Sequence, residues 1–211
     1  MKLAIIDYGA GNLRSVAKAF DYIGQKFVIT SSGDEIKSCS GIVLPGVGAF
    51  RQAAEKLIAA NLWDTLKTEA EKGKALFGIC LGMQLLFDES FEFGKTTGLG
   101  LIKGKVDNIN TGGQSLKIPH IGWNTLYFNK KSALFDGIEN GTYVYFVHSF
   151  SAVTDDENVT AFTDYGIKTV ASVERGNVLG TQFHPEKSGE KGLKILKNFC
   201  DMVKHDNFTC N

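Results

Sequence analysis

Short apolar runs that alternate with helical patterns constrain the fold of this chain more than any other feature. Four runs in the first half have the length of buried strands, and each ends in a loop that bears Gly, Ser or Pro: Leu3 to Ile6, Lys26 to Thr30, Gly41 to Leu44 and Ala75 to Ile79. After the first run, apolar residues recur at helical spacing from Leu13 to Ile23. This alternation predicts a parallel sheet with helices on both faces.

The rest of the chain adds helical segments and then a strand-rich half. Helices are expected at Phe50 to Ala60, Leu62 to Lys72, Leu81 to Phe87 and Gly192 to Val203. Strands are expected at Lys105 to Asn108, Thr125 to Phe128, Tyr143 to Val147, Val159 to Phe162, Thr169 to Val173 and Val178 to Phe183. The tail, residues 204–211, is expected to fray. Because no repeat or linker interrupts the chain, we interpret residues 1–211 as a single α/β domain with one mixed, mainly parallel sheet and a flavodoxin-like core.

Composition and charge exclude several classes of protein. With 43% apolar and 22% charged residues, the 211-residue chain has enough apolar material for a continuous core, which argues against disorder. The formal net charge is zero, so no bulk attraction to nucleic acid or to a membrane surface is expected. No apolar stretch approaches the roughly 20 residues of a membrane span, and Asp7 interrupts the N-terminal apolar run before a signal-peptide core forms.

The four cysteines are widely spaced and form neither a zinc motif nor a disulfide framework: Cys39, Cys80, Cys200 and Cys210. We therefore expect reduced thiols, a cytoplasmic location, and no metal or other cofactor.

One cysteine lies in a motif that predicts a nucleophile. The run Gly78-Ile79-Cys80-Leu81-Gly82 joins a buried strand to a helix, and it is the thiol version of a nucleophile elbow. Glycine on both flanks is expected because a tight turn leaves no room for a Cβ atom. The helix N-terminus would favour the thiolate form of Cys80. The alternative is a buried, inert cysteine beside two packing glycines, which is the interpretation we adopt for the other three cysteines.

A thiolate nucleophile requires a base, and the base requires an orienting acceptor. The sequence His184-Pro185-Glu186 supplies both at the end of the last strand-like run. Its alternative interpretation is a surface His–Glu pair without catalytic function. His120, His148 and His205 compete for the role of base, but none has a carboxylate two residues away in an extended segment.

Acyl chemistry also requires donors for a developing oxyanion. The backbone N–H of Leu81 comes with the elbow. A second donor is expected in the Gly-rich loop Leu44 to Phe50, at Val47 and Gly48. Cradling a phosphate is the rival function for this loop, but the Lys-Ser/Thr of a P-loop is missing.

Together these motifs resemble the class I, or triad, glutamine amidotransferases over nearly the whole chain. The segments that carry the resemblance are Gly78 to Gln84, Pro45 to Gly48 and Gln182 to Glu186. Others resemble more narrowly the glutaminase subunits of the imidazole glycerol phosphate synthases: Asp7 to Asn12, Pro119 to Asn124, Tyr145 to Ser149, and Lys187-Ser188.

The resemblance implies hydrolysis of L-glutamine to glutamate and ammonia through a Cys80–His184–Glu186 triad. It further implies that Gln84 and Glu92 hold the glutamine head group, with the backbone around His148 and Ser149 completing the pocket. Glu92 matches the family only by its offset from Cys80. The aromatic pair that usually follows the serine is replaced by Phe150-Ser151.

The resemblance also implies a partner, a (β/α)8-barrel cyclase subunit that receives the ammonia and makes imidazole glycerol phosphate and an aminoimidazole carboxamide ribotide. The residues expected to face it are Asn12, Trp123, Tyr145 and Lys187. Isolated glutaminase activity is then expected to be weak until the partner binds its ligand.

Three alternatives remain open at the level of sequence. A paralogous subunit that supplies ammonia for surface-sugar modification would share all of this chemistry. A non-catalytic partner-binding module on the same scaffold is disfavoured by the intact triad. A stand-alone cysteine peptidase or esterase on the same fold is disfavoured, because it gives no reason to expect Gln84 just after the elbow.

Overall fold

The computed structural model describes residues 1–205 and 208. The last helix extends to His205, so the expected fraying of the tail is wrong for Lys204 and His205. The remainder of that expectation, and Cys210, fall on residues 206–207 and 209–211, which lie outside the described residues.

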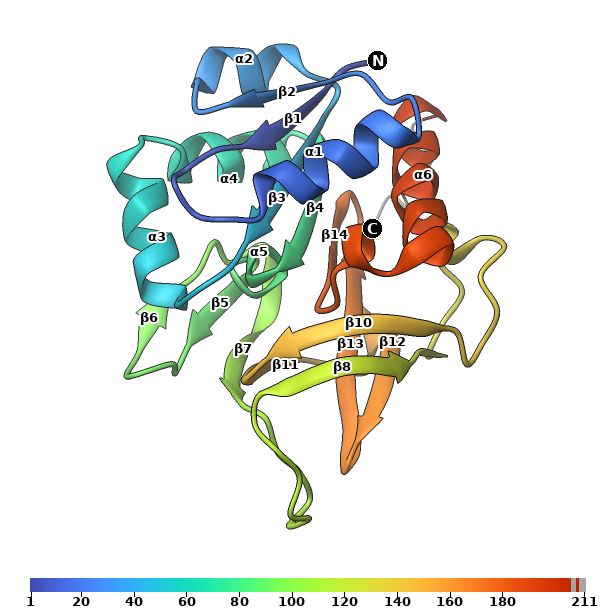
Figure 1. Cartoon of the computed structure of the whole chain (residues 1–211). Helices are drawn as coiled ribbons and strands as arrows, with labels where there is room; N and C mark the ends of the chain where they lie inside the picture. The colour runs from blue at the N-terminus through green and yellow to red at the C-terminus, as the bar shows by residue number, and fades with distance from the viewer. Residues whose placement is uncertain (206–207, 209–211) are drawn as a thin grey trace.

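An eight-stranded sheet forms the centre of the molecule (Figure 1). Its strands, in spatial order, are β2 (Phe27–Thr30), β1 (Leu3–Ile6), β3 (Gly41–Gly46), β4 (Ala75–Cys80), β14 (Val178–Thr181), β13 (Ile167–Arg175), β12 (Val159–Tyr165) and β9 (Tyr127–Phe128). The first five strands run parallel and the last three antiparallel. The predicted mixed, mainly parallel α/β sheet is confirmed. Its order places β4 between β3 and β14, so the loops that follow these three strands meet at one edge.

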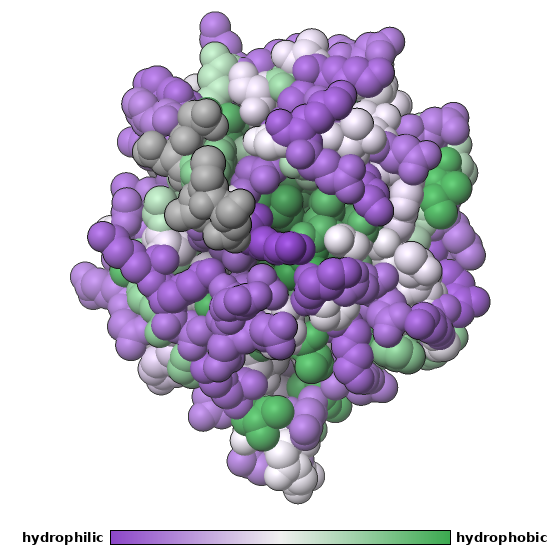
Figure 2. Space-filling model, turned by 180° about the vertical axis from the view of Figure 1, so that it is seen from behind, coloured by the Kyte–Doolittle hydropathy of each residue, from purple (hydrophilic) through white to green (hydrophobic). Residues whose placement is uncertain are grey.

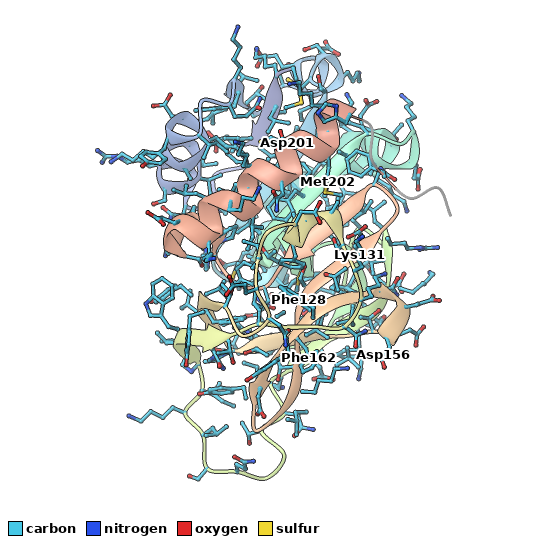
Figure 3. The ribbon with its side chains drawn as sticks, turned by 90° about the vertical axis from the view of Figure 1, so that its right-hand side faces the viewer. Phe128, Lys131, Asp156, Phe162, Asp201 and Met202 are labelled. Atoms are coloured by element: carbon cyan, nitrogen blue, oxygen red, sulfur yellow. The ribbon has the colours of Figure 1, made fainter. Side chains whose placement is uncertain are left out.

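Helices cover both faces of the sheet, as predicted. One face packs against α1 (Leu13–Tyr22) and α6 (Gly189–His205), and the other against α2 (Gly33–Ser38), α3 (Phe50–Ala59) and α4 (Trp63–Glu71). Alternate residues of β1 enter the two cores, because successive side chains of a strand point to opposite faces. Figure 3 shows α6 lying across the strands, with Met202 buried and Asp201 exposed.

Two smaller sheets contradict the expectation of one sheet for the whole chain. One pairs β10 (Tyr143–His148) with β8 (His120–Thr125), and the other has the order β11 (Phe150–Val153), β7 (Ile102–Asn108), β5 (Phe87–Ser90) and β6 (Thr96–Thr97). The His184 N–H donates to the Tyr145 carbonyl at 2.9 Å. This contact holds β10 across the carboxyl ends of the central strands, where it closes over the loops instead of extending the main sheet (Figure 1).

Two local predictions are also wrong. The expected helix from Leu81 to Phe87 ends early, as α5 (Leu81–Gln84). The carbonyls of Leu85, Leu86 and Phe87 accept hydrogen bonds from residues 99–102, so this buried backbone is satisfied without a longer helix. The expected strand from Thr125 to Phe128 is divided between β8 and β9, since Leu126 bonds to the Thr142 and Gly141 backbone between them.

None of the helices among the described residues combines the length and apolar character needed to cross a bilayer. The face in Figure 2 is mostly hydrophilic, with hydrophobic residues visible in a hollow near its middle.

The close approach at Gly82 predicts a large loss of stability on substitution. In Gly82→Ala the new Cβ would lie 1.8 Å from the Leu44 carbonyl oxygen, a backbone atom of the buried strand β3. We expect the free energy of unfolding in urea to fall by about 3 kcal/mol or more. Gly33→Ala, whose Cβ meets only the Thr65 side chain, is the control, and an equal loss in both variants would contradict the explanation.

Candidate active site

Cys80 occupies a strained turn between β4 and α5. Its φ is 55° and its ψ is −111°, a conformation that non-glycine residues rarely adopt. A Cβ at Gly78 would lie 2.6 Å from the Gly82 carbonyl oxygen, and one at Gly82 would clash with the Leu44 carbonyl. Both flanking glycines are therefore required by contact, as the sequence predicts for a nucleophile elbow. The turn holds the side chain at the carboxyl edge of the sheet, 7% exposed.

His184 and Glu186 form a buried pair directly after β14. His184 Nδ1 lies 2.8 Å from Glu186 Oε1, and both side chains are almost completely covered. A ring of hydrogen bonds holds this turn against β10. The His184 N–H donates to the Tyr145 carbonyl, the Tyr145 N–H donates to Ser188 Oγ, and that hydroxyl donates to the His184 carbonyl. The backbone of the histidine is thereby anchored on both sides.

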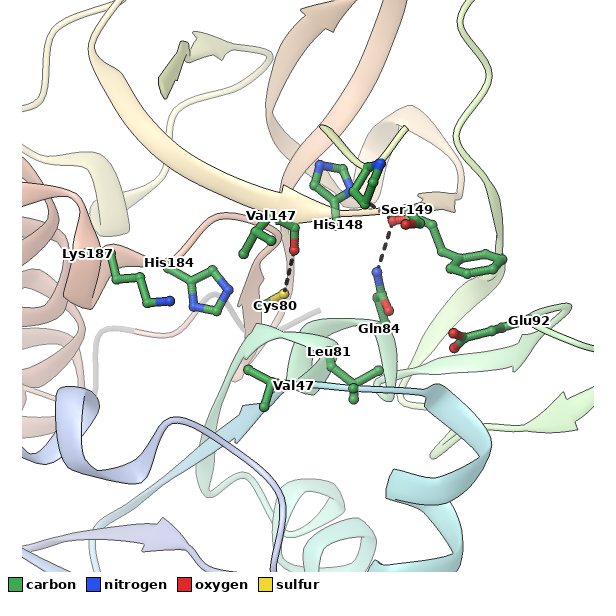
Figure 4. Close-up of a pocket in the computed structure, with 13 residues that line it drawn as sticks. Val47, Cys80, Leu81, Gln84, Glu92, Val147, His148, Ser149, His184 and Lys187 are labelled. Atoms are coloured by element: carbon green, nitrogen blue, oxygen red, sulfur yellow. Dashed lines mark hydrogen bonds between the residues drawn. The ribbon is translucent and has the colours of Figure 1, made fainter. Parts of the chain in front are cut away.

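The other nitrogen of the imidazole is left for the cysteine. His184 Nε2 is buried and has no hydrogen-bond partner among the described residues, and Figure 4 shows the ring beside the Cys80 sulfur. Burial by itself lowers the pKa of His184, but the neighbouring Cys80 sulfur and the Glu186 carboxylate raise the pKa to about 9. This environment favours a protonated imidazole next to the Cys80 sulfur.

A cavity of about 410 Å³ opens around the two residues. Figure 4 shows Lys187, His184, Cys80, Gln84 and Glu92 following one another across it. The lining also includes Val47, Gly48, Leu81, His148 and Ser149. Every residue that the sequence predicts for the oxyanion hole and the glutamine pocket therefore lies on one cavity. Among the described residues, no group of three or more His, Cys, Asp or Glu side chains is arranged to hold a metal ion.

Two of the predicted pocket residues have protein partners. Glu92 Oε2 accepts a hydrogen bond from the Phe50 N–H at 2.6 Å, which places this carboxylate at the N-terminus of α3. Gln84 Nε2 donates to the Phe150 carbonyl at 3.0 Å and to Gln182 Oε1 at 2.9 Å. Both side chains are buried. The pocket wall is thus held in place by hydrogen bonds before any ligand enters.

His148 belongs to a chain of polar contacts behind the pocket. Its Nδ1 lies 2.8 Å from the Phe150 carbonyl, and its Nε2 lies 3.0 Å from His120 Nδ1. The Asn124 amide continues the chain to His120 Nε2 at 3.3 Å. Because carbonyls only accept, His148 must carry its proton on Nδ1 and accept from His120. Burial lowers the pKa of His120 to about 4 and that of His148 to about 3, so both are neutral at pH 7.

Of the four residues expected to face a partner, three are joined by contacts of their side chains and Asn12 is not. Trp123 and Tyr145 pack edge to face with ring centroids 6.1 Å apart, and Lys187 Nζ lies 5.8 Å from the Tyr145 ring centroid. This aromatic cluster of Trp123, Tyr145 and Lys187 adjoins the cavity through Lys187. Asn12 is the N-cap residue that directly precedes α1, and no hydrogen bond or ring contact among the described residues joins it to the cluster.

Comparison with known proteins agrees with the geometry. Residues 4–203 match the family described as Glutamine amidotransferase class-I. Three proteins named imidazole glycerol phosphate synthase subunit HisH are similar over nearly their whole length. The one from Caldanaerobacter subterraneus subsp. tengcongensis is 52% identical (96% of this chain, 98% of the relative), that from Aquifex aeolicus 49% (94% and 96%), and that from Archaeoglobus fulgidus 48% (96% and 99%).

The chain belongs to the HisH family of class I glutamine amidotransferases. Solved structures agree on the fold. A crystal structure described as glutamine amidotransferase has a TM-score of 0.75 at 17% identity, covering 95% of this chain and 98% of that one. The structure of PurLQS from Thermotoga maritima has a TM-score of 0.73 at 24% identity, covering 96% and 98%.

In this member of the HisH family, sequence reasoning missed Gln182 and Phe150 as site residues. Gln182 is completely buried, and its Nε2 lies 3.7 Å from Cys80 Sγ. One signal was available: Gln182 falls in the strand expected from Val178 to Phe183, two residues before His184, and alternate residues of a strand point to the same side. In the structure the strand ends at Thr181, and both residues lie in the turn that follows it. Phe150 acts through its carbonyl, for which side-chain identity carries no signal.

The neutral histidine pair predicts acid sensitivity. Unfolded histidines titrate near pH 6.5, whereas folded His148 and His120 resist protonation down to about pH 3 and 4. Between about pH 6.5 and 4 the unfolded chain therefore binds more protons, and the free energy of unfolding falls as the pH falls. Each histidine contributes a slope of up to about 1.4 kcal/mol per pH unit.

Urea unfolding at several pH values measures this slope. We expect a smaller slope in His148→Asn and an unchanged one in His205→Asn, since His205 is exposed at the end of α6. Equal slopes in the wild-type protein and in His148→Asn would contradict the assignment of this acid sensitivity to the buried pair.

Proposed function

We propose that this chain is a glutaminase subunit that hydrolyses L-glutamine to glutamate and ammonia and passes the ammonia to a synthase partner in histidine biosynthesis. The observation that carries the proposal is the buried Glu186–His184 pair facing Cys80 on a cavity that also holds Gln84 and Glu92. The HisH names of the relatives indicate the pathway.

The first half of the reaction forms a thioester. The Cys80 thiolate attacks the side-chain carboxamide carbon of glutamine, and a carbon–sulfur bond forms while the carbonyl oxygen becomes an oxyanion. The N–H groups of Leu81 and of the Val47–Gly48 loop are proposed to stabilise this charge. The carbon–nitrogen bond then breaks, and the His184 imidazolium protonates the departing nitrogen, which leaves as ammonia.

The second half releases glutamate. His184, now neutral, takes a proton from water, and the resulting hydroxide attacks the thioester carbon. The carbon–oxygen bond forms, the carbon–sulfur bond breaks, and the Cys80 thiolate is restored beside the imidazolium. Glu186 holds Nδ1 throughout, which keeps Nε2 directed at the sulfur and stabilises the positive ring. Gln84, Glu92 and the backbone at His148 and Ser149 are proposed to bind the glutamine head group.

The partner in this proposal is a (β/α)8-barrel cyclase subunit that uses the ammonia to form imidazole glycerol phosphate and an aminoimidazole carboxamide ribotide. The aromatic cluster of Trp123, Tyr145 and Lys187 supports this. Trp123 is exposed and Tyr145 is half-buried, and accessible aromatic residues beside a catalytic cavity are typical of interfaces. Asn12 is proposed to lie on the same surface. The cytoplasm is the proposed compartment, and the free thiols of Cys39, Cys80 and Cys200 support it.

Removing the nucleophile or the base tests the triad. We expect Cys80→Ala and His184→Ala to lower glutamate release about 10⁴-fold or more in the presence of the barrel partner, while binding to that partner persists. A coupled glutamate assay measures the rate. Cys39→Ala is the matched control, because Cys39 is also buried and free but lies outside the cavity. Full activity in either triad variant would disprove the assignment.

Shortening Trp123 tests the proposed interface. The side chain is 55% exposed in the free chain, so its truncation should spare the fold. We expect Trp123→Ala to weaken association with the barrel subunit at least about tenfold, as aromatic interface residues commonly do. Titration calorimetry measures the Kd. Ile58→Ala, 57% exposed on α3, is the control, and a Kd unchanged from wild type in Trp123→Ala would contradict the proposed surface.

A further inference from the structure

We propose that Gln182 is a further catalytic residue of this site, whose side-chain amide donates a hydrogen bond to the Cys80 thiolate and so stabilises the anionic nucleophile. This inference rests on the proposed function, which it deepens by assigning a role to a residue outside the triad. It is drawn from three buried side chains, those of Cys80, Gln182 and Gln84, which hydrogen bonds connect in series to the backbone of β11.

The chain of contacts is short and enclosed. Gln182 Nε2 lies 3.7 Å from Cys80 Sγ, within the range of a hydrogen bond to sulfur. On its other side, Gln182 Oε1 accepts from Gln84 Nε2 at 2.9 Å. That same Gln84 nitrogen donates to the Phe150 carbonyl at 3.0 Å. Gln182 has no exposed surface and Gln84 is 5% exposed, so water does not compete for these groups.

The polarity of this chain is determined at its backbone end. A backbone carbonyl only accepts hydrogen bonds, so Gln84 must present its NH₂ group to Phe150. The same NH₂ group meets Gln182, which must therefore present its oxygen to Gln84. Because an amide carries its oxygen and nitrogen on opposite arms, the NH₂ group of Gln182 is left facing the sulfur. If the Gln182 amide were rotated by 180°, its NH₂ group would face the NH₂ group of Gln84 and its oxygen would face the Cys80 sulfur. Both hydrogen bonds would then be lost.

Two contacts of the sulfur suit its two protonation states. The Val147 carbonyl lies 3.8 Å from Cys80 Sγ and accepts from the thiol S–H (Figure 4). Gln182 donates, and a hydrogen bond donated to an ionised group is stronger than one to a neutral group. A donor placed on the charged form favours that form. When the Cys80 thiol loses its proton to His184, the sulfur thus no longer donates to the Val147 carbonyl but still accepts from Gln182.

The sulfur carries negative charge twice in the proposed reaction, first as the nucleophile and again as the leaving group when water cleaves the thioester. In the thioester between these steps, sulfur is neutral and a poor acceptor. The Gln182 bond is therefore strongest at the two points where charge is concentrated on sulfur. Gln182 directly follows β14, which ends at Thr181, and lies two residues before His184, so one turn brings donor and base to the sulfur.

Other groups around the sulfur do not supply this donor. Tyr8 approaches from the loop after β1, but its hydroxyl donates to the Pro45 carbonyl at 3.0 Å. Burial and the Cys80 charge raise the pKa of Tyr8, so it stays neutral. His184 is the base. The neutral His148 donates its Nδ1 proton to the Phe150 carbonyl and has none left for the sulfur. Lys187 and Glu92 line the cavity at its two ends (Figure 4).

The test measures the ionisation of Cys80 in the full-length chain without glutamine. The rate of alkylation of the Cys80 peptide by iodoacetamide is followed against pH by mass spectrometry. We expect the midpoint in Gln182→Met to rise by about one pH unit, with alkylation about tenfold slower at a fixed pH below both midpoints. The control Asn198→Leu removes another buried amide, one that bonds Leu134 and Asp136, and is expected to keep the wild-type midpoint. An unshifted midpoint in folded Gln182→Met would overturn the proposal.

A second measurement uses the unaltered protein, in case Gln182→Met does not fold. In a sample with ¹⁵N-labelled glutamine side chains, the NMR signals of the Gln182 amide protons are expected to move downfield as the pH rises, with the same midpoint as alkylation. No movement would also overturn the proposal.

The outcomes separate this inference from the proposed function. If the wild-type protein with its barrel partner releases no glutamate, the proposed function fails whatever the midpoint. If glutamate release depends on Cys80 but the midpoint does not depend on Gln182, only this inference fails.

Discussion

The close approach of two backbones at Gly82 is the constraint on which the rest of the site depends. The first turn of α5 lies so near the Leu44 carbonyl of β3 that no side chain fits between them. This contact forces the chain to reverse sharply at the end of β4, and Cys80 takes a positive φ as a result. The strain is borne by the surrounding packing, since β4 is buried along its whole length between β3 and β14.

Strand order then brings the other groups to the sulfur. Because β14 pairs in parallel with β4, the turn that carries His184 emerges beside the elbow. The ring of hydrogen bonds through Tyr145 and Ser188 fixes that turn against β10, and β10 itself forms a wall of the cavity. The same strand carries Tyr145, the half-buried member of the aromatic cluster. One strand thus connects the base, the pocket and the surface that we propose for the partner.

Local chemistry was predictable where neighbouring residues determine it. The two glycines around Cys80 and the spacing of His184 and Glu186 predicted an elbow and an oriented imidazole, and the structure has both arrangements. The helix expected after the elbow was predicted too long, because the carbonyls of Leu86 and Phe87 accept hydrogen bonds from residues 100–102, a contact that periodicity does not reveal. In the second half, the strands predicted at Val159 to Phe162, Thr169 to Val173 and Val178 to Phe183 do join the central sheet. Those predicted at Lys105 to Asn108 and Tyr143 to Val147 were assigned to the wrong sheet, since period-two patterns do not specify a strand's neighbour.

The sequence by itself determined which reactive groups exist and how each is held by its immediate neighbours, because sterics and short-range hydrogen bonds act within a few residues. Only the tertiary structure decided that Cys80 and His184 meet, that β10 closes the cavity, and that Gln182 turns its NH₂ group to the sulfur. The last of these depends on one backbone carbonyl at Phe150, whose position follows from strand pairing. Strand pairing joins segments far apart in the chain, and many patterns of apolar residues are compatible with the same pairing.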